Sequence, residues 1–177
     1  MRLFSAVEIP EEAKEKIYNL HKGIQTSAIV KWVREENLHI TLKFFGEVNS
    51  PPQVVEVIKE ASKDLSPFEV SLQGLGAFPG QRRIVVLWVG IDLGEEKLVE
   101  LYRGIENQGS RFGFKKEGRE YTPHITIGRV KRGKLSFPEV DISYSPFLAK
   151  EVTLFKSTLT PKGPIYEVVE HFPLGEN

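Results

Sequence analysis

The sequence predicts an α+β fold of two pseudo-symmetric lobes that face each other across a central cleft. Two observations support this: strand-like segments are interspersed with a few helical ones, and the order of features in the first half returns in the second. The displacement is 81, 84 and 85 residues for the pairs Leu3 and Ile84, Glu11 and Glu95, and His39 and His124. A nearly constant displacement indicates an internal duplication. We therefore expect one domain over residues 1–177, with repeats at roughly 1–75 and 84–171. A strand from one repeat can belong to the sheet of the other.

The first half is expected to contain four strands and two helices. Alternating or continuous apolar residues predict strands over 3–9, 29–33, 39–45 and 68–75. Pro10 begins a helix, because two glutamates follow it in the first turn and apolar residues then recur at helical spacing. Ser50 caps a second helix, which Pro51 opens. We interpret the Gly/Pro-rich segment 74–80 as a break between the two halves.

The second half repeats this order and then extends it. A buried strand is expected over 84–91, and an amphipathic helix over 95–108. Further strands are expected over 124–130, 150–159 and 165–171. The segment 111–134 holds eight Lys and Arg residues against two Glu, in a chain whose 24 basic and 24 acidic residues otherwise balance. This basic segment is either a solvated loop or a local patch for a nucleic acid.

The composition excludes several classes of protein. Apolar residues make up 40% and charged residues 27%, which is ordinary for a globular protein and disfavours disordered, collagenous and coiled-coil structures. The longest apolar run, 84–89, is too short to cross a bilayer, and the N-terminus lacks the pattern of a signal peptide. The absence of cysteine excludes disulfides, thiolate zinc sites and a cysteine nucleophile. We expect a cytoplasmic protein without membrane contact.

The repeated strands open with matching tetrads, and this is the most informative feature of the sequence. One tetrad is His39-Ile-Thr41-Leu and the other is His124-Ile-Thr126-Ile. Residues two apart share one face of a strand, so each histidine lies beside its threonine while the aliphatic residues face the core. By the quasi-symmetry of the lobes, the two His/Thr pairs should face each other across the cleft.

Two histidines and two threonines suit phosphodiester cleavage without a metal. Because the ordinary pKa of imidazole is about 6.5, one histidine can accept a proton near pH 7 while the other donates one. The threonine hydroxyls can donate hydrogen bonds to the non-bridging oxygens of a phosphoryl group.

Three other interpretations compete with this one. A metal site would need a third ligand, and no His-x-x-x-His spacing or cysteine pair accompanies either tetrad. A serine hydrolase would need a nucleophile elbow, and no Gly-x-Ser-x-Gly occurs. The third interpretation is that the histidines are structural. We interpret His21 and His171, which lack the pattern, in that way.

The tetrads and the residues around them resemble the two-histidine (2H) phosphoesterase superfamily. The resemblance is strongest to its bacterial and archaeal RNA 2',3'-cyclic phosphodiesterases, also called 2'-5' RNA ligases. It covers nearly the whole chain, including the segments 1–7, 32–33, 37–46 and 123–129. It implies antiparallel sheets that line the cleft, with helices outside.

The resemblance also implies an activity: hydrolysis of a terminal 2',3'-cyclic phosphate to a 2'-phosphomonoester, with 2'-5' ligation as a related reaction. It assigns His39 as the proton donor and His124 as the acceptor, with Thr41 and Thr126 beside them. We expect a monomer without a metal or other cofactor, acting on RNA ends, tRNA-derived ones included, or on a small cyclic nucleotide. The alternatives are a phosphodiesterase for another cyclic or 2'-5'-linked nucleotide, and a non-catalytic module that binds nucleotides or RNA.

Strand alternation extends the expected site. It places Lys43 and Phe45 on the cleft side, as a cation for phosphate and a ring for a base. It also places Gly128 there, whereas Arg129 points away unless a bulge intervenes. The loop residues that we expect to contact RNA are Arg82, Arg83, Lys115 and Tyr121.

Overall fold

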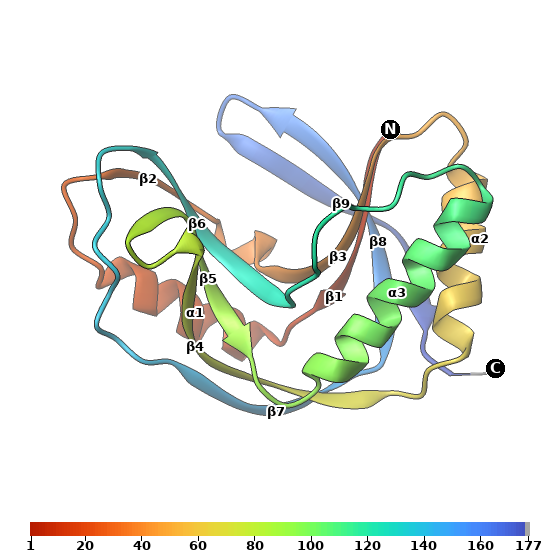
Figure 1. Ribbon diagram of the computed structural model, residues 1–177, viewed down its shortest axis with the longest axis horizontal. Coiled ribbons are helices and arrows are strands. Elements are labelled where there is room, and N and C mark those ends of the chain that lie inside the picture. The colour runs from red at the N-terminus through yellow and green to blue at the C-terminus, as the bar shows by residue number, and fades with distance from the viewer. Residues whose placement is uncertain (176–177) are drawn as a thin grey trace.

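The computed structural model describes residues 1–175 and confirms the α+β class (Figure 1). Within these residues the chain forms nine strands, three α-helices and one short 3-10 helix. The strands are β1 (Arg2–Glu8), β2 (Ile29–Trp32), β3 (His39–Glu47), β4 (Phe68–Gly80), β5 (Arg83–Ile91), β6 (His124–Arg132), β7 (Ser143–Ala149), β8 (Glu151–Thr160) and β9 (Gly163–Pro173). The helices are α1 (Glu11–Lys22), η1 (Glu35–Asn37), α2 (Pro51–Lys63) and α3 (Glu95–Arg111). None of the helices in this part of the chain is long and apolar enough to span a membrane.

The strands pair into two antiparallel sheets that share strands between the halves of the sequence. The first sheet has the order β3-β1-β8-β9 and the second has the order β2-β6-β5-β4-β7. Strand β2, from the first half, therefore pairs with β6 from the second half, and β8 pairs with β1. Strands β3 and β6, which carry the two tetrads, contact each other where the sheets meet.

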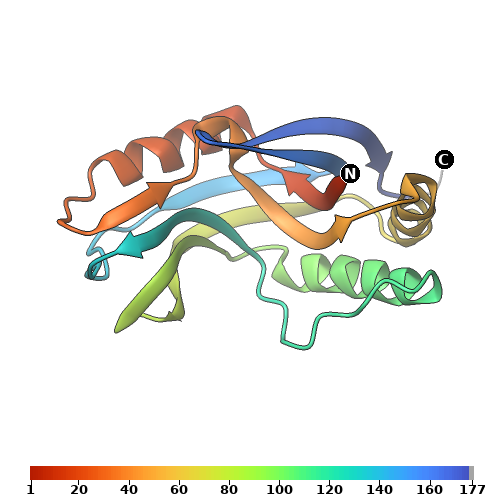
Figure 2. The same cartoon turned by 90° about the horizontal axis from the view of Figure 1, so that it is seen from above.

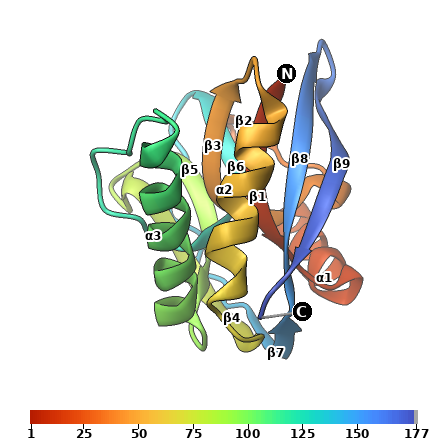
Figure 3. The same cartoon turned by 90° about the vertical axis from the view of Figure 1, so that its right-hand side faces the viewer.

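The three helices lie at two ends of the molecule. Helices α2 and α3 pack side by side and contact strands of the first sheet (Figure 3). Helix α1 lies at the other end (Figure 2), where His21 stacks on Trp32 of β2 with 4.9 Å between ring centroids. Each helix buries the apolar stripe that its sequence predicts. Ile17 of α1, Ile58 of α2 and Leu101 of α3 are almost completely buried.

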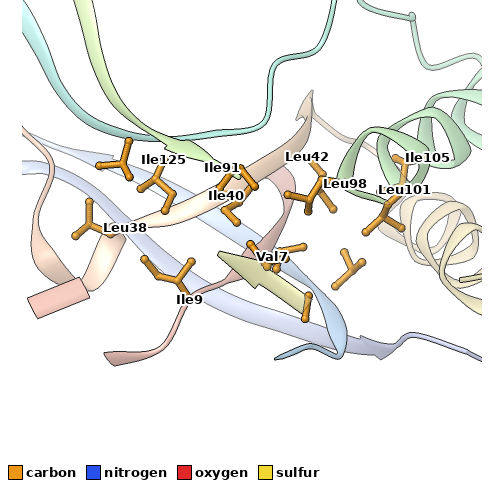
Figure 4. Close-up of a cluster of buried hydrophobic side chains, with 14 of the residues drawn as sticks. Val7, Ile9, Leu38, Ile40, Leu42, Ile91, Leu98, Leu101, Ile105 and Ile125 are labelled. Carbon is orange, nitrogen blue, oxygen red and sulfur yellow. The ribbon is translucent and has the colours of Figure 1, made fainter. Parts of the chain in front are cut away.

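The aliphatic residues at the second and fourth positions of the tetrads form part of one core. Ile40, Leu42 and Ile125 pack with residues of β1, β5 and α3 (Figure 4). Each is at most 2% exposed, and burial of one such side chain stabilises a fold by about 1.5–3 kcal/mol. The core thus fixes the strand faces that carry the histidines.

One sequence prediction about the strands is wrong, and one strand was missed. The segment 74–80 is not a break, because β4 continues through it to Gly80 and pairs with β5. A register shift between Leu72 and Leu75 accommodates Gly74, which has a φ of 76°. Strand β7 was not predicted. It contains Pro146, and this proline is tolerated because β7 lies at the edge of the second sheet.

Candidate active site

The four tetrad residues line one cleft of about 1150 Å³ between β3 and β6. Both strands have the same order of buried, half-buried and exposed residues over their nine positions. His39 and Thr41 in β3, and His124 and Thr126 in β6, are half-buried residues that face this cleft. The structure therefore brings together the two pairs that the sequence duplication relates.

A main-chain carbonyl two residues before each histidine holds its ring. Nδ1 of His39 lies 2.6 Å from the carbonyl oxygen of Asn37, and Nδ1 of His124 lies 2.6 Å from that of Thr122. Because a carbonyl oxygen can only accept, each Nδ1 carries a proton and Nε2 is the accepting nitrogen of the neutral ring. The Thr41 hydroxyl donates to Nε2 of His39 across 2.7 Å. Both rings are therefore held in the same tautomer.

Asn37 also connects the first histidine to the start of β9. Its side-chain amide donates to the Pro164 carbonyl at 3.0 Å, while its own carbonyl accepts from His39. Nearby, the Arg34 guanidinium donates to the Lys162 carbonyl at 2.8 Å. Sequence reasoning missed this link, since its partners lie 127 and 128 residues apart in the chain.

Aromatic rings surround both histidines. Those around His39 are Phe4, Tyr166 and Phe155, at centroid distances of 5.1, 5.5 and 6.3 Å. Those around His124 are Phe78 and Trp88, at 5.0 and 5.6 Å. An apolar environment of this kind disfavours the charged form of an imidazole.

Burial accordingly lowers the pKa of both histidines. For His39, burial outweighs the opposing hydrogen bond to the Asn37 carbonyl and lowers the pKa to about 4. For His124, burial is again the main cause of a lowered pKa, and the positive charge of Arg129 adds to it. Both histidines are therefore neutral near pH 7 in the free protein.

The lowered pKa of His39 predicts a loss of stability in acid. Between pH 6.5 and about 4 the unfolded chain protonates this histidine while the folded protein does not, so the free energy of unfolding falls as the pH falls. The loss from this one group is at most about 3 kcal/mol, and it is absent above pH 6.5. Urea unfolding of the wild type and of His39→Gln at pH 7.5 and pH 4.5 should show a smaller pH-dependent loss in the variant. Equal losses would contradict the lowered pKa.

A β-bulge reverses the faces of β3 after its tetrad. Ala6 of β1 pairs with Thr41 and Ser5 pairs with Lys43, which leaves Leu42 as the extra residue. The next side chain on the cleft side is therefore Phe44, which is 55% exposed and lines the cleft. Strict alternation did not predict this position.

The predicted cleft positions of Lys43 and Phe45 are wrong for the same reason. Lys43 is 2% exposed, pairs with Glu106 of α3 and donates to the Lys115 carbonyl at 3.0 Å. Phe45 packs edge-on against Phe114, with 5.3 Å between ring centroids. Neither residue belongs to the cleft lining.

The same bulge occurs in β6 and places Arg129 in the cleft. Trp88 pairs with Thr126 and Leu87 pairs with Gly128, so Ile127 is the extra residue. Arg129 is exposed and lines the cleft, which is the arrangement that the sequence permitted only with a bulge. Gly128 is not on the cleft side as predicted. It lies against Trp32, and a Cβ atom there would come within 2.7 Å of that ring.

The predicted loop residues divide into two groups. Tyr121 and Lys115 line the cleft, and the Tyr121 hydroxyl donates to the Thr41 carbonyl at 2.7 Å. Burial raises the pKa of Tyr121, so its hydroxyl keeps its proton and remains a donor. Arg82, in the turn between β4 and β5, and Arg83, at the start of β5, lie outside the lining residues.

Positive charge dominates the cleft walls. The lining includes eight Lys or Arg residues and two Glu. The basic residues are Lys31, Arg34, Lys115, Lys116, Arg119, Arg129, Lys131 and Lys162. They come from β2, the residues between β2 and η1, the loop before β6, β6 and the β8–β9 turn, so the basic segment seen in the sequence supplies only part of the charge. Such a surface attracts phosphate groups. Within residues 1–175, no group of three or more His, Cys, Asp or Glu side chains could hold a metal ion.

Comparisons with known proteins agree on one family. The model of the 2'-5' RNA ligase superfamily matches residues 10–154. A Methanocaldococcus jannaschii protein named RNA 2',3'-cyclic phosphodiesterase is 42% identical over 97% of this chain and 100% of its own. A Methanothermobacter thermautotrophicus protein of the same name is 35% identical over 98% and 99%. The crystal structure of the Thermus thermophilus protein TT0787 aligns with a TM-score of 0.87 and 27% identity, over 100% of both chains.

Proposed function

The chain belongs to the 2'-5' RNA ligase superfamily, and from this we propose that it is an RNA 2',3'-cyclic phosphodiesterase. It opens the terminal 2',3'-cyclic phosphate of an RNA and leaves a 2'-phosphomonoester. The observation that carries the proposal is the pair of His/Thr sets on quasi-equivalent strands, which line one basic cleft.

The reaction is one in-line displacement at phosphorus. His124 accepts a proton from water at Nε2 as the water oxygen bonds to phosphorus. The bond between phosphorus and O3' breaks, and His39 donates a proton to O3', which becomes the free 3'-hydroxyl. When a 5'-hydroxyl replaces water, the same displacement joins two RNA ends in a 2'-5' linkage.

Binding of the substrate leads to protonation of the catalytic acid, His39. The cyclic phosphate carries a negative charge, and an anion beside a buried imidazole raises its pKa. His39, which is neutral in the free protein near pH 7, then takes up the proton that it later donates. The Thr41 and Thr126 hydroxyls and the Arg129 guanidinium donate hydrogen bonds to the non-bridging oxygens, where negative charge is carried in the transition state.

Hydrolysis should be independent of metal ions, because these side chains supply both proton transfer and charge stabilisation. An RNA ending in a 2',3'-cyclic phosphate, incubated with the protein in EDTA, should be hydrolysed at the rate seen without EDTA. The variant that lacks both cleft histidines serves as the background control. If chelation stops the reaction and zinc or manganese restores it, metal catalysis replaces the proposed mechanism. If RNA binds but remains intact in all conditions, the protein is a binding module.

A further inference from the structure

The loop between α3 and β6, residues 112–123, forms one wall of the cleft (Figure 2). Eight consecutive residues of this loop line the cleft, although the segment contains no helix or strand. Its C-terminal end contacts both tetrads. The Tyr121 hydroxyl donates to the Thr41 carbonyl. The Thr122 carbonyl accepts from Nδ1 of His124. The strands that carry the histidines therefore fix this end of the loop.

A buried ion pair outside the cleft fixes the other half of the loop. Lys43 of β3 and Glu106 of α3 are 2% and 6% exposed, and their side chains pair with each other. Lys43 also donates to the Lys115 carbonyl at 3.0 Å. Glu106 also accepts from the Glu117 amide at 2.8 Å. Over residues 115–120 the main chain makes no other hydrogen bond with the part of the chain that the structure describes, 1–175.

Both members of this pair are needed to hold the loop. Burial raises the pKa of Glu106, but hydrogen bonds from Lys43 and from the Glu117 amide outweigh it, so the pKa is lowered overall. A buried charge is costly unless it is paired and hydrogen-bonded, so each side chain requires the other. Tyr102 completes the cluster. Its hydroxyl donates to Glu106 at 3.1 Å, and its ring stacks on that of Tyr121 with 4.2 Å between centroids.

The segment that the pair fixes carries the cations of this wall. Lys115, Lys116 and Arg119 line the cleft, but so do Glu117 and Glu120. Because the two acidic residues offset most of this charge, attraction to phosphate depends on where each cation is placed. Lys116 donates to a side chain of α3 at 2.9 Å. Within residues 1–175, this leaves Lys115 and Arg119 as the cations that the loop offers to the cleft without a partner of their own.

We propose that the Lys43–Glu106 pair positions Lys115 and Arg119 to bind the backbone phosphates of the nucleotides that precede the cyclic end of the RNA. This inference rests on the proposed function. The cleft, at about 1150 Å³, is larger than the usual small-molecule pocket of about 300–1,000 Å³, so it has room for more than the terminal nucleotide. Lys43 and Glu106 are positioning residues, because neither lines the cleft. A cyclic mononucleotide lacks these phosphates and should not depend on the pair.

The test compares an RNA oligonucleotide that ends in a 2',3'-cyclic phosphate with cytidine 2',3'-cyclic phosphate. The double variant Lys43→Met/Glu106→Leu removes both anchors without leaving a buried charge unpaired. Lys97→Met/Glu100→Leu is the matched control, because that pair belongs to the same helix and is exposed. Thermal unfolding checks that each protein is folded. Initial rates over a range of salt concentrations give kcat and KM.

The Lys43→Met/Glu106→Leu variant should raise KM for the RNA by about 3- to 30-fold, which is what two exposed ion pairs contribute. Its kcat, and its KM for the mononucleotide, should stay close to those of the wild type. The slope of log(kcat/KM) for the RNA against log[salt] should become shallower by about 1.4, because each phosphate contact of a single strand contributes about 0.7. The matched control should behave as the wild type does.

Lys115→Ala/Arg119→Ala should produce the same changes as loss of the pair. Combining the two double variants should add little, because the pair acts through these cations. An increase in KM that is equal for RNA and mononucleotide would overturn the inference, and so would losses that multiply in the combined variant.

Glu106→Gln keeps the test decisive if the Lys43→Met/Glu106→Leu variant does not fold. Glutamine retains an acceptor oxygen for the Glu117 amide but lacks the charge that pairs with Lys43. It should raise KM for the RNA alone, by less than loss of the whole pair. An unchanged KM for the RNA in this variant would contradict the inference. Failure of the wild type to hydrolyse either substrate would instead overturn the proposed function.

Discussion

His39→Ala and His124→Ala should each lower kcat by about 10²- to 10⁴-fold while leaving KM nearly unchanged. Both rings line the cleft, and each is fixed by a carbonyl so that Nε2 is available for proton transfer. Initial rates on an RNA with a terminal cyclic phosphate measure the effect. His171→Ala is the matched control, because His171 pairs with Glu151 outside the cleft lining and its loss should leave the rate unchanged.

The double variant should be scarcely slower than either single variant. Acid and base act in one displacement, so removing the first leaves the second with little to contribute. If the two losses instead multiply, the histidines act in separate steps. If both single variants remain fully active, the tetrads are structural and the mechanism is wrong.

Arg129→Ala should have the second largest effect, a loss in kcat of about 10²- to 10³-fold. A donor placed at the developing charge contributes more to the transition state than to the bound substrate, so kcat should fall more than KM rises. Arg132→Ala is the matched control. Arg132 belongs to the same strand and is exposed, but it lies outside the cleft lining.

Arg129→Lys separates charge from geometry. Lysine keeps the positive charge but lacks the forked donors of a guanidinium, so its rate should lie between those of wild type and Arg129→Ala. A loss of less than threefold in Arg129→Ala would contradict the role of this residue in stabilising the transition state.

The sequence predicted the parts of the site that depend on local pattern. The repeat, the order of most elements and the His/Thr faces all follow from periodicity, because the core side of each strand is strongly apolar. Alternation failed at Leu42 and Ile127, where a bulge adds one residue to each strand. A bulge leaves little trace in a run of apolar residues. The sequence signal for the bulge in β6 was Arg129, a charged residue that strict alternation would place toward the core.

Other features depend on contacts between distant segments. Lys43 is buried because Glu106 of α3 neutralises it, and no local pattern identifies that partner. The pairing of β2 with β6 across the two halves is similarly non-local. The segment 74–80 looked like a break because glycine and proline usually interrupt strands, yet two register shifts accommodate them within β4.

The most direct test of the account is the pH dependence of kcat/KM for wild type, His39→Ala and His124→Ala. The base, His124, must be neutral, so kcat/KM falls as the pH falls. The acid, His39, must be protonated, so kcat/KM falls as the pH rises. Because burial lowers the pKa of both histidines and kcat/KM reports the free protein, we expect a bell-shaped profile with its optimum below pH 6.5.

His124→Ala should lose the acidic limb of this profile, and His39→Ala should lose the alkaline limb. Loss of the opposite limbs would show that the two roles are exchanged. A bell that persists unchanged in both variants would contradict the claim that these two histidines form the acid–base pair.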